Sequence, residues 1–181
     1  MTGIETVAAI ATLRDEHEVI LRALSLLERL GQALEATRPL NRTSLGWLVE
    51  FFRTFADRCH HGKEEQHLFP ALARHDVPVE GGPVGVMLAE HAEGRQLLGV
   101  IGAGTDREVA EAIRGYVALL RAHIDKENTI LFPLAEHILD EDERRRLAAG
   151  FAAVEETFLG PGVHDGLVRR LARLEAELSP P

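Results

Sequence analysis

Apolar residues recur along almost the whole chain with the three- to four-residue spacing of amphipathic helices. In the first such segment, Leu13, Ile20, Leu24 and Leu27 keep one apolar stripe. No segment shows the convincing two-residue alternation of a half-buried β-strand. The hydrophobic pattern therefore predicts an all-α protein.

Helix-breaking and helix-capping residues divide this pattern into four long helices and two shorter ones. We expect the long helices at about 4–34, 43–75, 83–101 and 105–139, and the shorter ones at about 140–158 and 164–178. Capping boxes mark three of the starts, at Thr2-x-x-Glu5, Thr105-x-x-Glu108 and Asp140-x-x-Glu143. Pro70 and Pro133 lie inside helical patterns, where we expect a kink or a short break.

Four long helices with short connections predict an antiparallel up-down four-helix bundle. The sequence places this bundle in residues 1–139 and leaves 140–181 as a C-terminal helical extension. We expect the two shorter helices of the extension to pack on the outside of the bundle or over one end.

The composition narrows the class of protein. With 29 acidic residues against 20 Lys and Arg, the net charge of -9 argues against a nucleic-acid partner, which needs a basic surface. The single Cys excludes a disulfide framework and a thiolate zinc site. No segment resembles a signal peptide or a membrane span, so we expect a cytoplasmic protein without a membrane partner. The unusual feature is the content of nine histidines.

An internal repeat organises these histidines. The pattern His-x-x-Lys-Glu-x-x-x-Leu-Phe-Pro occurs at 60–70 and again at 123–133, an offset of 63 residues. The preceding helices match more weakly, because Glu16-His17 corresponds to Glu90-His91. The bundle therefore looks like two copies of one helical hairpin, each with a lone His on its first helix and a His-x-x-x-Glu on its second.

The spacing indicates metal binding. Residues four apart project from one helix face, so each His-x-x-x-Glu presents an imidazole together with a carboxylate. These groups suit iron, manganese or zinc, but four His and two Glu are too many for one tetrahedral zinc. They fit two metals if both carboxylates bridge, with two nitrogens and two oxygens for each metal. A bridging water, hydroxide or oxide then leaves one position on each metal for dioxygen, peroxide or nitric oxide.

These motifs give the chain a family resemblance. Over about 13–137 it resembles the hemerythrin-like, or HHE, cation-binding domains. The resemblance implies a four-helix bundle that holds a non-haem pair of iron ions with an oxo or hydroxo bridge; zinc or manganese also suit such ligands. Carried over position by position, it implies the ligands His17, His60, Glu64, His91, His123 and Glu127.

The chain also departs from the oxygen-carrying hemerythrins, which add a second His one turn from the third-helix ligand and use His-x-x-x-x-Asp on the fourth helix. Here Met87 and Arg95 stand one turn from His91. This favours sensing, detoxification or iron protection, with dioxygen, peroxide or nitric oxide as the small ligand, over stable oxygen carriage. The alternatives are iron storage or donation, including repair of iron–sulfur centres, a peroxide-decomposing oxidoreductase, and a zinc-loaded structural bundle. The oligomeric state is left open.

Neighbouring residues leave further alternatives open. His61 and Glu65 repeat the His-x-x-x-Glu spacing one residue later, but Ile124 stands at the counterpart of His61, so the repeat favours His60 and Glu64. His67 follows Glu64 by three residues, a spacing found in ferritin-like di-iron bundles. Whether His61, Glu65, His67 or His164 joins the site stays open.

Two acidic residues directly precede the lone histidines. We expect Glu16 and Glu90 to face solvent or to pair with Arg14 or Arg95, with support of the ligand histidines as the alternative. We expect Cys59 to pack as a small apolar residue.

Overall fold

The structure of the protein is a computed structural model that describes residues 8–178. Its helices are α1 (Ala8–Glu35), α2 (Arg42–Phe51), η1 (Phe52–His61), η2 (Glu64–Leu68), α3 (Phe69–Arg74), α4 (Pro83–Ala103), α5 (Asp106–Lys126), η3 (Glu127–Leu131), α6 (Phe132–Ile138), α7 (Glu141–Phe158) and α8 (Val163–Leu178), where η denotes a π-helix. No strand occurs between residues 8 and 178, so the predicted all-α class is confirmed. The capping box predicted at Thr2 and Glu5 lies outside the described residues.

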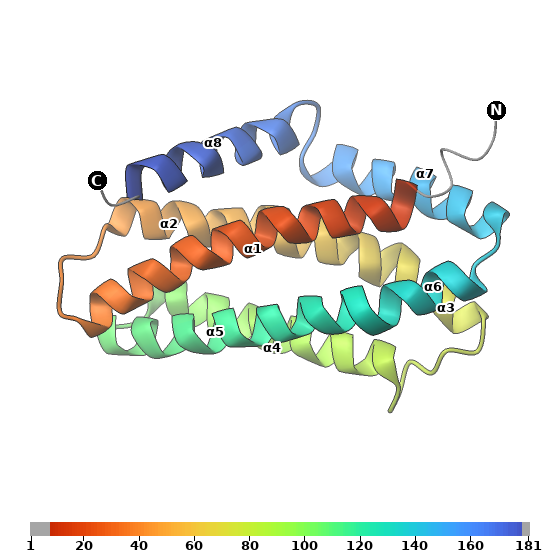
Figure 1. The fold of residues 1–181 in the computed structure, drawn as a ribbon, viewed down its shortest axis with the longest axis horizontal. Helices are drawn as coiled ribbons and strands as arrows, with labels where there is room; N and C mark the ends of the chain where they lie inside the picture. Colours follow the sequence, from red (N-terminus) through yellow and green to blue (C-terminus); the bar gives the residue numbers. More distant parts are fainter. Residues whose placement is uncertain (1–7, 179–181) are drawn as a thin grey trace.

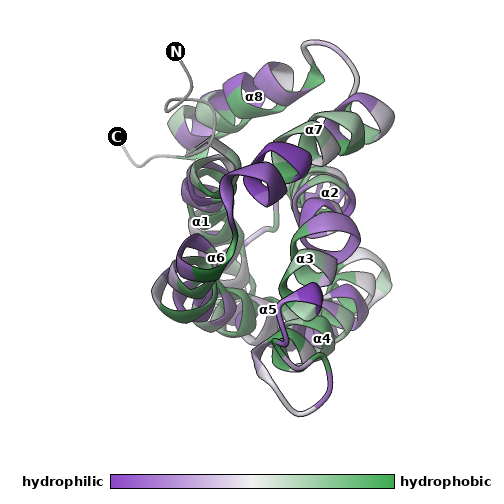
Figure 2. Cartoon of the chain, turned by 90° about the vertical axis from the view of Figure 1, so that its right-hand side faces the viewer, coloured by the Kyte–Doolittle hydropathy of each residue, from purple (hydrophilic) through white to green (hydrophobic). Residues whose placement is uncertain are grey.

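All of these helices except α7 and α8 form four long rods. Helical hydrogen bonding continues from α2 through η1 and η2 into α3, and from α5 through η3 into α6. In chain order, the first rod is α1, the second is the composite from α2 to α3, the third is α4 and the fourth is the composite from α5 to α6; they run antiparallel in a bundle (Figure 1). Seen from one end, the apolar faces of the four rods turn toward a common centre (Figure 2). The arrangement is the predicted up-down four-helix bundle.

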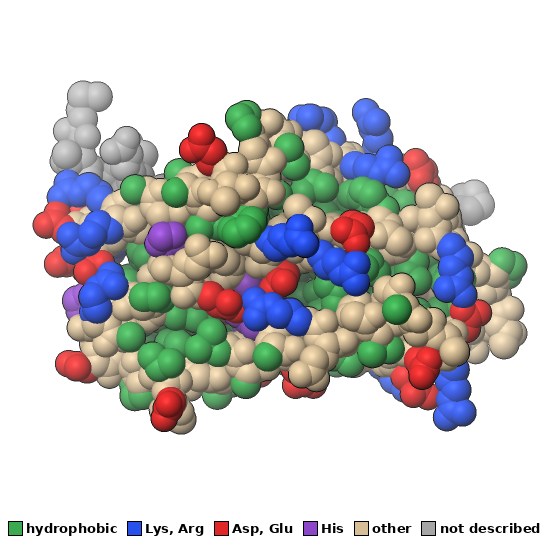
Figure 3. Space-filling model, turned by 180° about the vertical axis from the view of Figure 1, so that it is seen from behind, with side chains coloured by type: hydrophobic (Ala, Val, Ile, Leu, Met, Phe, Trp, Pro, Cys, Tyr) green, Lys and Arg blue, Asp and Glu red, His purple; other side chains and the backbone are tan. Residues whose placement is uncertain are grey.

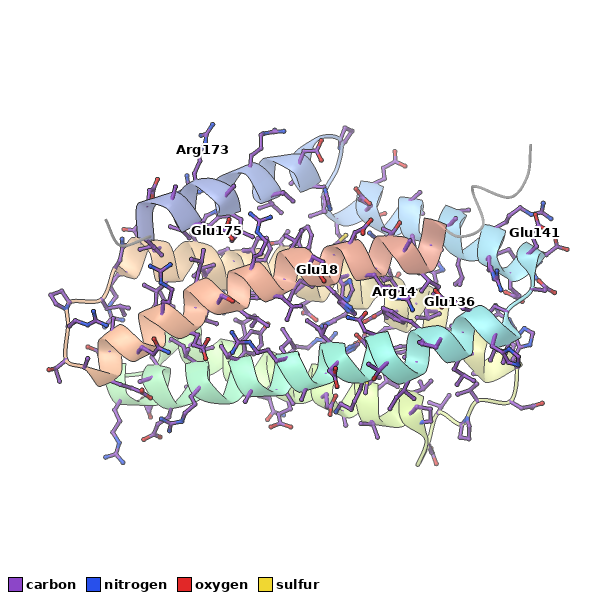
Figure 4. All side chains as sticks on the ribbon, viewed as in Figure 1. Arg14, Glu18, Glu136, Glu141, Arg173 and Glu175 are labelled. Carbon is purple, nitrogen blue, oxygen red and sulfur yellow. The ribbon has the colours of Figure 1, made fainter. Side chains whose placement is uncertain are left out.

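The two C-terminal helices lie along one side of the bundle, over α1 and α2 (Figures 1 and 2). Helix α7 packs on α1, η1 and η2, while α8 packs on α1. Glu175 points from α8 toward the bundle and accepts two hydrogen bonds from Arg22 of α1 (Figure 4). The guanidinium of Arg170 also lies over the ring of Trp47.

Side chains at the helix starts satisfy the backbone N–H groups that lack helical partners there. Asn41 accepts a hydrogen bond from the backbone N–H of Ser44 at the start of α2. Glu108 accepts from the backbone N–H of Thr105, and Asp140 accepts from that of Glu143. The last two caps lie where the sequence predicts helix starts.

Neither proline inside a helix breaks the chain of helical hydrogen bonds. Proline has no N–H and its ring crowds the carbonyl four residues earlier. A π-helical turn stands before each proline: Phe69 donates its N–H to the carbonyl of Glu64, and Phe132 donates to that of Glu127. These bonds span five residues and widen the helix where an α-helical turn would clash. The short break expected near Pro70 therefore does not occur.

Buried apolar side chains form two clusters along the bundle rather than one. On α1, Leu13 belongs to one cluster and Ile20 to the other. On the fourth rod, Leu131 belongs to the cluster of Leu13, and Ile124 belongs to the cluster of Ile20. A buried polar layer separates the two clusters on every rod.

The outer surface carries both charge signs. Acidic and basic side chains are interspersed over the face opposite to that of Figure 1 (Figure 3). Arg14 on α1 and Glu136 on α6 point toward one another and form an ion pair (Figure 4). Between residues 8 and 178, no helix has the length and apolar character needed to cross a bilayer.

Candidate metal centre

The polar layer contains five imidazoles and two carboxylates from all four rods. All seven side chains are buried, with at most 4% of any residue exposed. They are His17 from α1, His60, His61 and Glu64 from the second rod, His91 from α4, and His123 and Glu127 from the fourth rod. The six residues predicted from the repeat thus lie together, and His61 joins them.

The seven side chains fall into two groups that could each hold a metal ion. One group consists of His17, His60, Glu64 and Glu127, and the other of His61, Glu64, His91 and His123. In each group, one nitrogen or oxygen atom per residue lies within 4.8 Å of all the others. Glu64 belongs to both groups, so its carboxylate lies between the two candidate positions.

Both carboxylates contact imidazoles from opposite sides. The Glu64 oxygens lie 3.5 Å from Nε2 of His60 and 3.5 Å from Nε2 of His91. The Glu127 oxygens lie 3.1 Å from Nε2 of His17 and 3.3 Å from Nε2 of His123. Each carboxylate therefore faces imidazoles of both groups, as bridging ligands would.

Each of these five imidazoles has a hydrogen-bond acceptor at Nδ1, the ring nitrogen that faces away from the centre. Nδ1 of His17 lies 3.0 Å from the amide oxygen of Asn128. In the other four rings, Nδ1 lies near a carboxylate oxygen: His60 at 2.9 Å from Glu16, His61 at 3.4 Å from Asp57, His91 at 2.7 Å from Glu65 and His123 at 2.9 Å from Glu90. An oxygen acceptor at Nδ1 places the proton there and leaves a lone pair on Nε2. All five Nε2 atoms thus turn their lone pairs toward the centre, the orientation that metal-binding histidines adopt.

The inner atoms lack the hydrogen bonds that buried polar atoms require. Nε2 of His17 and all four oxygens of Glu64 and Glu127 are buried without a hydrogen-bond partner. Nε2 of His91 faces Nε2 of His123 at 3.1 Å, which sets one lone pair against another. Unpaired buried groups of this kind are costly, and cations between them would satisfy all of them. The donor set therefore fits a pair of metal ions.

The environment shifts the pKa values of these groups in different directions, lowering those of His60 and His61 and raising those of His123 and Glu64. Burial lowers the pKa of His60 to about 4 and that of His61 well below its ordinary value, so both rings are neutral at pH 7. Burial, together with the charge of the neighbouring Glu127, raises the pKa of Glu64 well above its ordinary value. The two facing carboxylates repel one another when both are ionised, and bound cations would neutralise this repulsion.

The structure corrects the expectation that Glu16 and Glu90 face solvent or pair with arginines. Glu16 is buried and accepts hydrogen bonds from Nδ1 of His60 and from Nζ of Lys63. Glu90 accepts from Nδ1 of His123 and from Nζ of Lys126. Glu and Lys occupy corresponding places in both repeats, and this shared pairing is the sequence signal that identifies them.

The residue after each of the two carboxylates, Glu64 and Glu127, reaches across to the other hairpin. Glu65 follows Glu64 and holds His91, and Asn128 follows Glu127 and holds His17. Glu65 therefore orients a ring, and it belongs to neither ligand group.

The π-helical geometry of η1 explains why two adjacent histidines both reach the centre. Adjacent residues of an α-helix diverge by about 100°, given 3.6 residues per turn. Because a π-helix has more residues per turn, His60 and His61 diverge less, and their ring centroids lie 5.7 Å apart. The repeat could not reveal His61, since its counterpart Ile124 packs in an apolar cluster.

Other candidates from the sequence lie outside the ligand groups. His67 packs near the ring of Phe151 on α7, and its ring would clash with any side chain at Gly150. His164 lies beside Asp165. Cys59 is buried, and burial raises the pKa of its thiol to about 12.

Comparisons with known proteins agree with this geometry. A family model described as the hemerythrin HHE cation binding domain matches residues 8–135. The chain is also similar to proteins of Mycobacterium bovis and Mycobacterium tuberculosis, each of which carries the name uncharacterized protein. The identity is 24% over 182 residues, covering 95% of this chain and 71% of each relative. No solved structure matches.

Proposed function

Because the chain belongs to the hemerythrin HHE cation-binding family, we propose that it is a non-haem di-iron protein that binds a small oxidant. The ligand would be dioxygen, peroxide or nitric oxide, and its binding would serve sensing, detoxification or protection of iron. The observation that carries the proposal is the convergence of five Nε2 lone pairs on two buried carboxylates that lack hydrogen-bond partners. A cytoplasmic location stays a prediction.

The residues would divide unequally between two ions. His17 and His60 would hold one ion, and His61, His91 and His123 the other, with Glu64 shared between them. Glu127 could also be shared, because its two oxygens face His17 and His123. Imidazole and carboxylate ligands suit iron. When bound, an iron pair supplies electrons and open coordination positions to a small oxidant. The two-histidine position has fewer protein ligands, which supports binding of an external ligand there.

The surroundings restrict what can reach the centre. The ligands are almost fully buried, and they lie between two apolar clusters that include Phe55 and Phe132. A substrate larger than a few atoms would have to displace packed side chains. This supports a diatomic or peroxide ligand.

The test is metal analysis combined with absorption spectra. We expect two iron ions per chain and spectral changes on exposure to dioxygen, peroxide or nitric oxide. His60→Ala and Glu127→Ala should reduce iron content, while His137→Ala, a change of an exposed histidine on the fourth rod, should leave it unchanged. Equal iron content in all these variants, or a chain that takes up no iron, would refute the proposal.

Peroxide decomposition is the second candidate, because the two-histidine position leaves room for peroxide. It predicts oxygen evolution when the iron-loaded protein is mixed with hydrogen peroxide. Absence of gas evolution would leave binding without turnover. Iron donation receives less support, since almost complete burial of all seven side chains opposes easy release of iron.

A further inference from the structure

A single arginine on α4 joins two carboxylates of the second rod. Nε of Arg95 donates a hydrogen bond to Oδ1 of Asp57 at 2.7 Å, and an Nη donates to Oε1 of Glu65 at 2.7 Å. We refer to Arg95, Asp57 and Glu65 as the Arg95 clamp. The ion pairs outweigh the effect of burial and raise the pKa of Arg95, so its guanidinium is positively charged at pH 7.

The same two oxygen atoms hold two imidazoles of the candidate metal centre. Oδ1 of Asp57 lies 3.4 Å from Nδ1 of His61, and Oε1 of Glu65 lies 2.7 Å from Nδ1 of His91. The two rings stack, with centroids 3.8 Å apart and planes 15° from parallel. One guanidinium therefore fixes both acceptors that orient a stacked pair of rings.

The Arg95 clamp differs from the support of His60. Lys63, which holds the acceptor of His60, is completely buried, whereas 43% of the Arg95 side chain is exposed. Asp57 and Glu65 are also about a quarter exposed. Without a shared cation, these two carboxylates would repel one another and turn toward water. The orientation of His61 and His91 thus depends on one replaceable surface residue.

We propose that Arg95 is a positioning residue for the three-histidine metal position: by fixing Asp57 and Glu65, it keeps Nε2 of His61 and His91 directed at the centre. The role at the metal rests on the proposed function, while the orientation of the rings does not. This separation allows the two to be tested independently.

The first test uses the metal-free protein and reads the tautomers of its histidines by nitrogen-15 NMR. Burial lowers the pKa of both His61 and His91, so each ring is neutral at pH 7 and its tautomer is defined. In the unchanged protein both should carry the proton on Nδ1. In Arg95→Gln both should become tautomer mixtures, while His60 keeps its Nδ1 proton. Unchanged tautomers of His61 and His91 would overturn the proposal.

Two further variants control for charge and for general destabilisation. Arg95→Lys keeps the charge but not the planar fork, so it should restore the tautomers partly. Arg22→Gln removes an arginine of similar exposure, 41%, whose partner Glu175 lies away from the metal centre. It should leave all five tautomers unchanged. Tautomer mixing of the same size in Arg22→Gln would show that Arg95 acts only through stability.

The second test uses Co(II) alone as the metal probe. After loading, a chelator should remove one of two Co(II) ions from Arg95→Gln about 10-fold or more faster than from the unchanged protein, because changes to groups that orient metal ligands typically cost 10–100-fold in affinity. The second ion should leave at the unchanged rate. Identical release of both ions in Arg95→Gln and Arg22→Gln would overturn the role at the metal. If the unchanged protein binds no Co(II), the proposed function fails, and the tautomers still decide the orienting role.

Discussion

Replacing Lys63 with methionine should destabilise the metal-free protein strongly. Lys63 is completely buried, and its ammonium donates to Glu16 and, at 3.3 Å, to Glu155 of α7. Burial alone would lower the pKa of Lys63, yet the charge of Glu16 raises it, so the pair is ionised. Methionine matches the length and flexibility of lysine, so Lys63→Met removes the charge and leaves little cavity.

The expected magnitude follows from the charge left behind. Removing one partner of a buried ion pair leaves an uncompensated charge and costs about 3–5 kcal/mol. Glu155 can turn to water because its side chain is 39% exposed, but Glu16 cannot, since its side chain is 4% exposed. We therefore expect a loss of about 3 kcal/mol or more in the free energy of unfolding, at the low end because His60 still donates to Glu16.

The internal repeat supplies a matched control. Lys126 pairs with Glu90 as Lys63 pairs with Glu16, but 35% of its side chain is exposed. Exposed ion pairs contribute about 0–1 kcal/mol, so Lys126→Met should cost no more than that. The two substitutions are chemically identical and occupy equivalent places in the repeat. Lys63 differs from Lys126 in its burial and in its second contact, to Glu155.

Urea unfolding followed by circular dichroism measures both costs in metal-free protein at pH 7. Adding Glu16→Gln to Lys63→Met removes the stranded charge, so the double variant should be more stable than Lys63→Met alone. Equal destabilisation by Lys63→Met and Lys126→Met would refute the reasoning, as would a double variant less stable than Lys63→Met.

The remaining predictions concern protons, stoichiometry and packing. Between pH 6.5 and about 4, the folded protein binds fewer protons at His60 than the unfolded chain does. The free energy of unfolding of the metal-free protein should therefore fall by up to about 3 kcal/mol as the pH falls through this window. Urea midpoints of His60→Gln should fall less over the same window. His61→Ala should reduce metal content from two ions per chain toward one by elemental analysis, whereas His67→Ala should keep both. Gly31→Ala should lower the melting temperature, because its Cβ would lie 2.7 Å from an isoleucine methyl group and overpacking costs about 1–3 kcal/mol; Gly46→Ala, with no atom within 4 Å of its Cβ, should not.

Most of the fold follows from local signals in the sequence. Apolar spacing indicates the helices, and residues such as Pro39 and Gly104 separate them at positions that the structure confirms within a few residues. The short break considered at Pro70 does not occur, although a proline inside a helical pattern ordinarily ends or kinks the helix. Here a π-helical turn accommodates it, and single-sequence periodicity does not distinguish π-turns from α-turns.

The site could be predicted where the repeat duplicates it and not where the two copies differ. His60 and His123 correspond to one another, so their shared context marks both of them. His61 corresponds to Ile124, and only the three-dimensional structure shows that its ring stacks on His91. The sequence does not reveal the full set of side chains that support the imidazoles, because the reach of a long side chain such as Lys63 depends on which helices are neighbours.

The differences between the copies matter more for chemistry than their similarity. Two identical hairpins would give two equivalent metal positions. His61 instead comes from the first hairpin but lies with His91 and His123 of the second, which makes one position richer in nitrogen. The acceptors at Nδ1 differ between the copies as well: Glu65 gives His91 an anionic acceptor, whereas Asn128 gives His17 a neutral one. A carboxylate at Nδ1 makes an imidazole a stronger donor. If two metal ions bind as proposed, both differences would give the three-histidine position the more strongly donating imidazoles and leave more room for an external ligand at the two-histidine position.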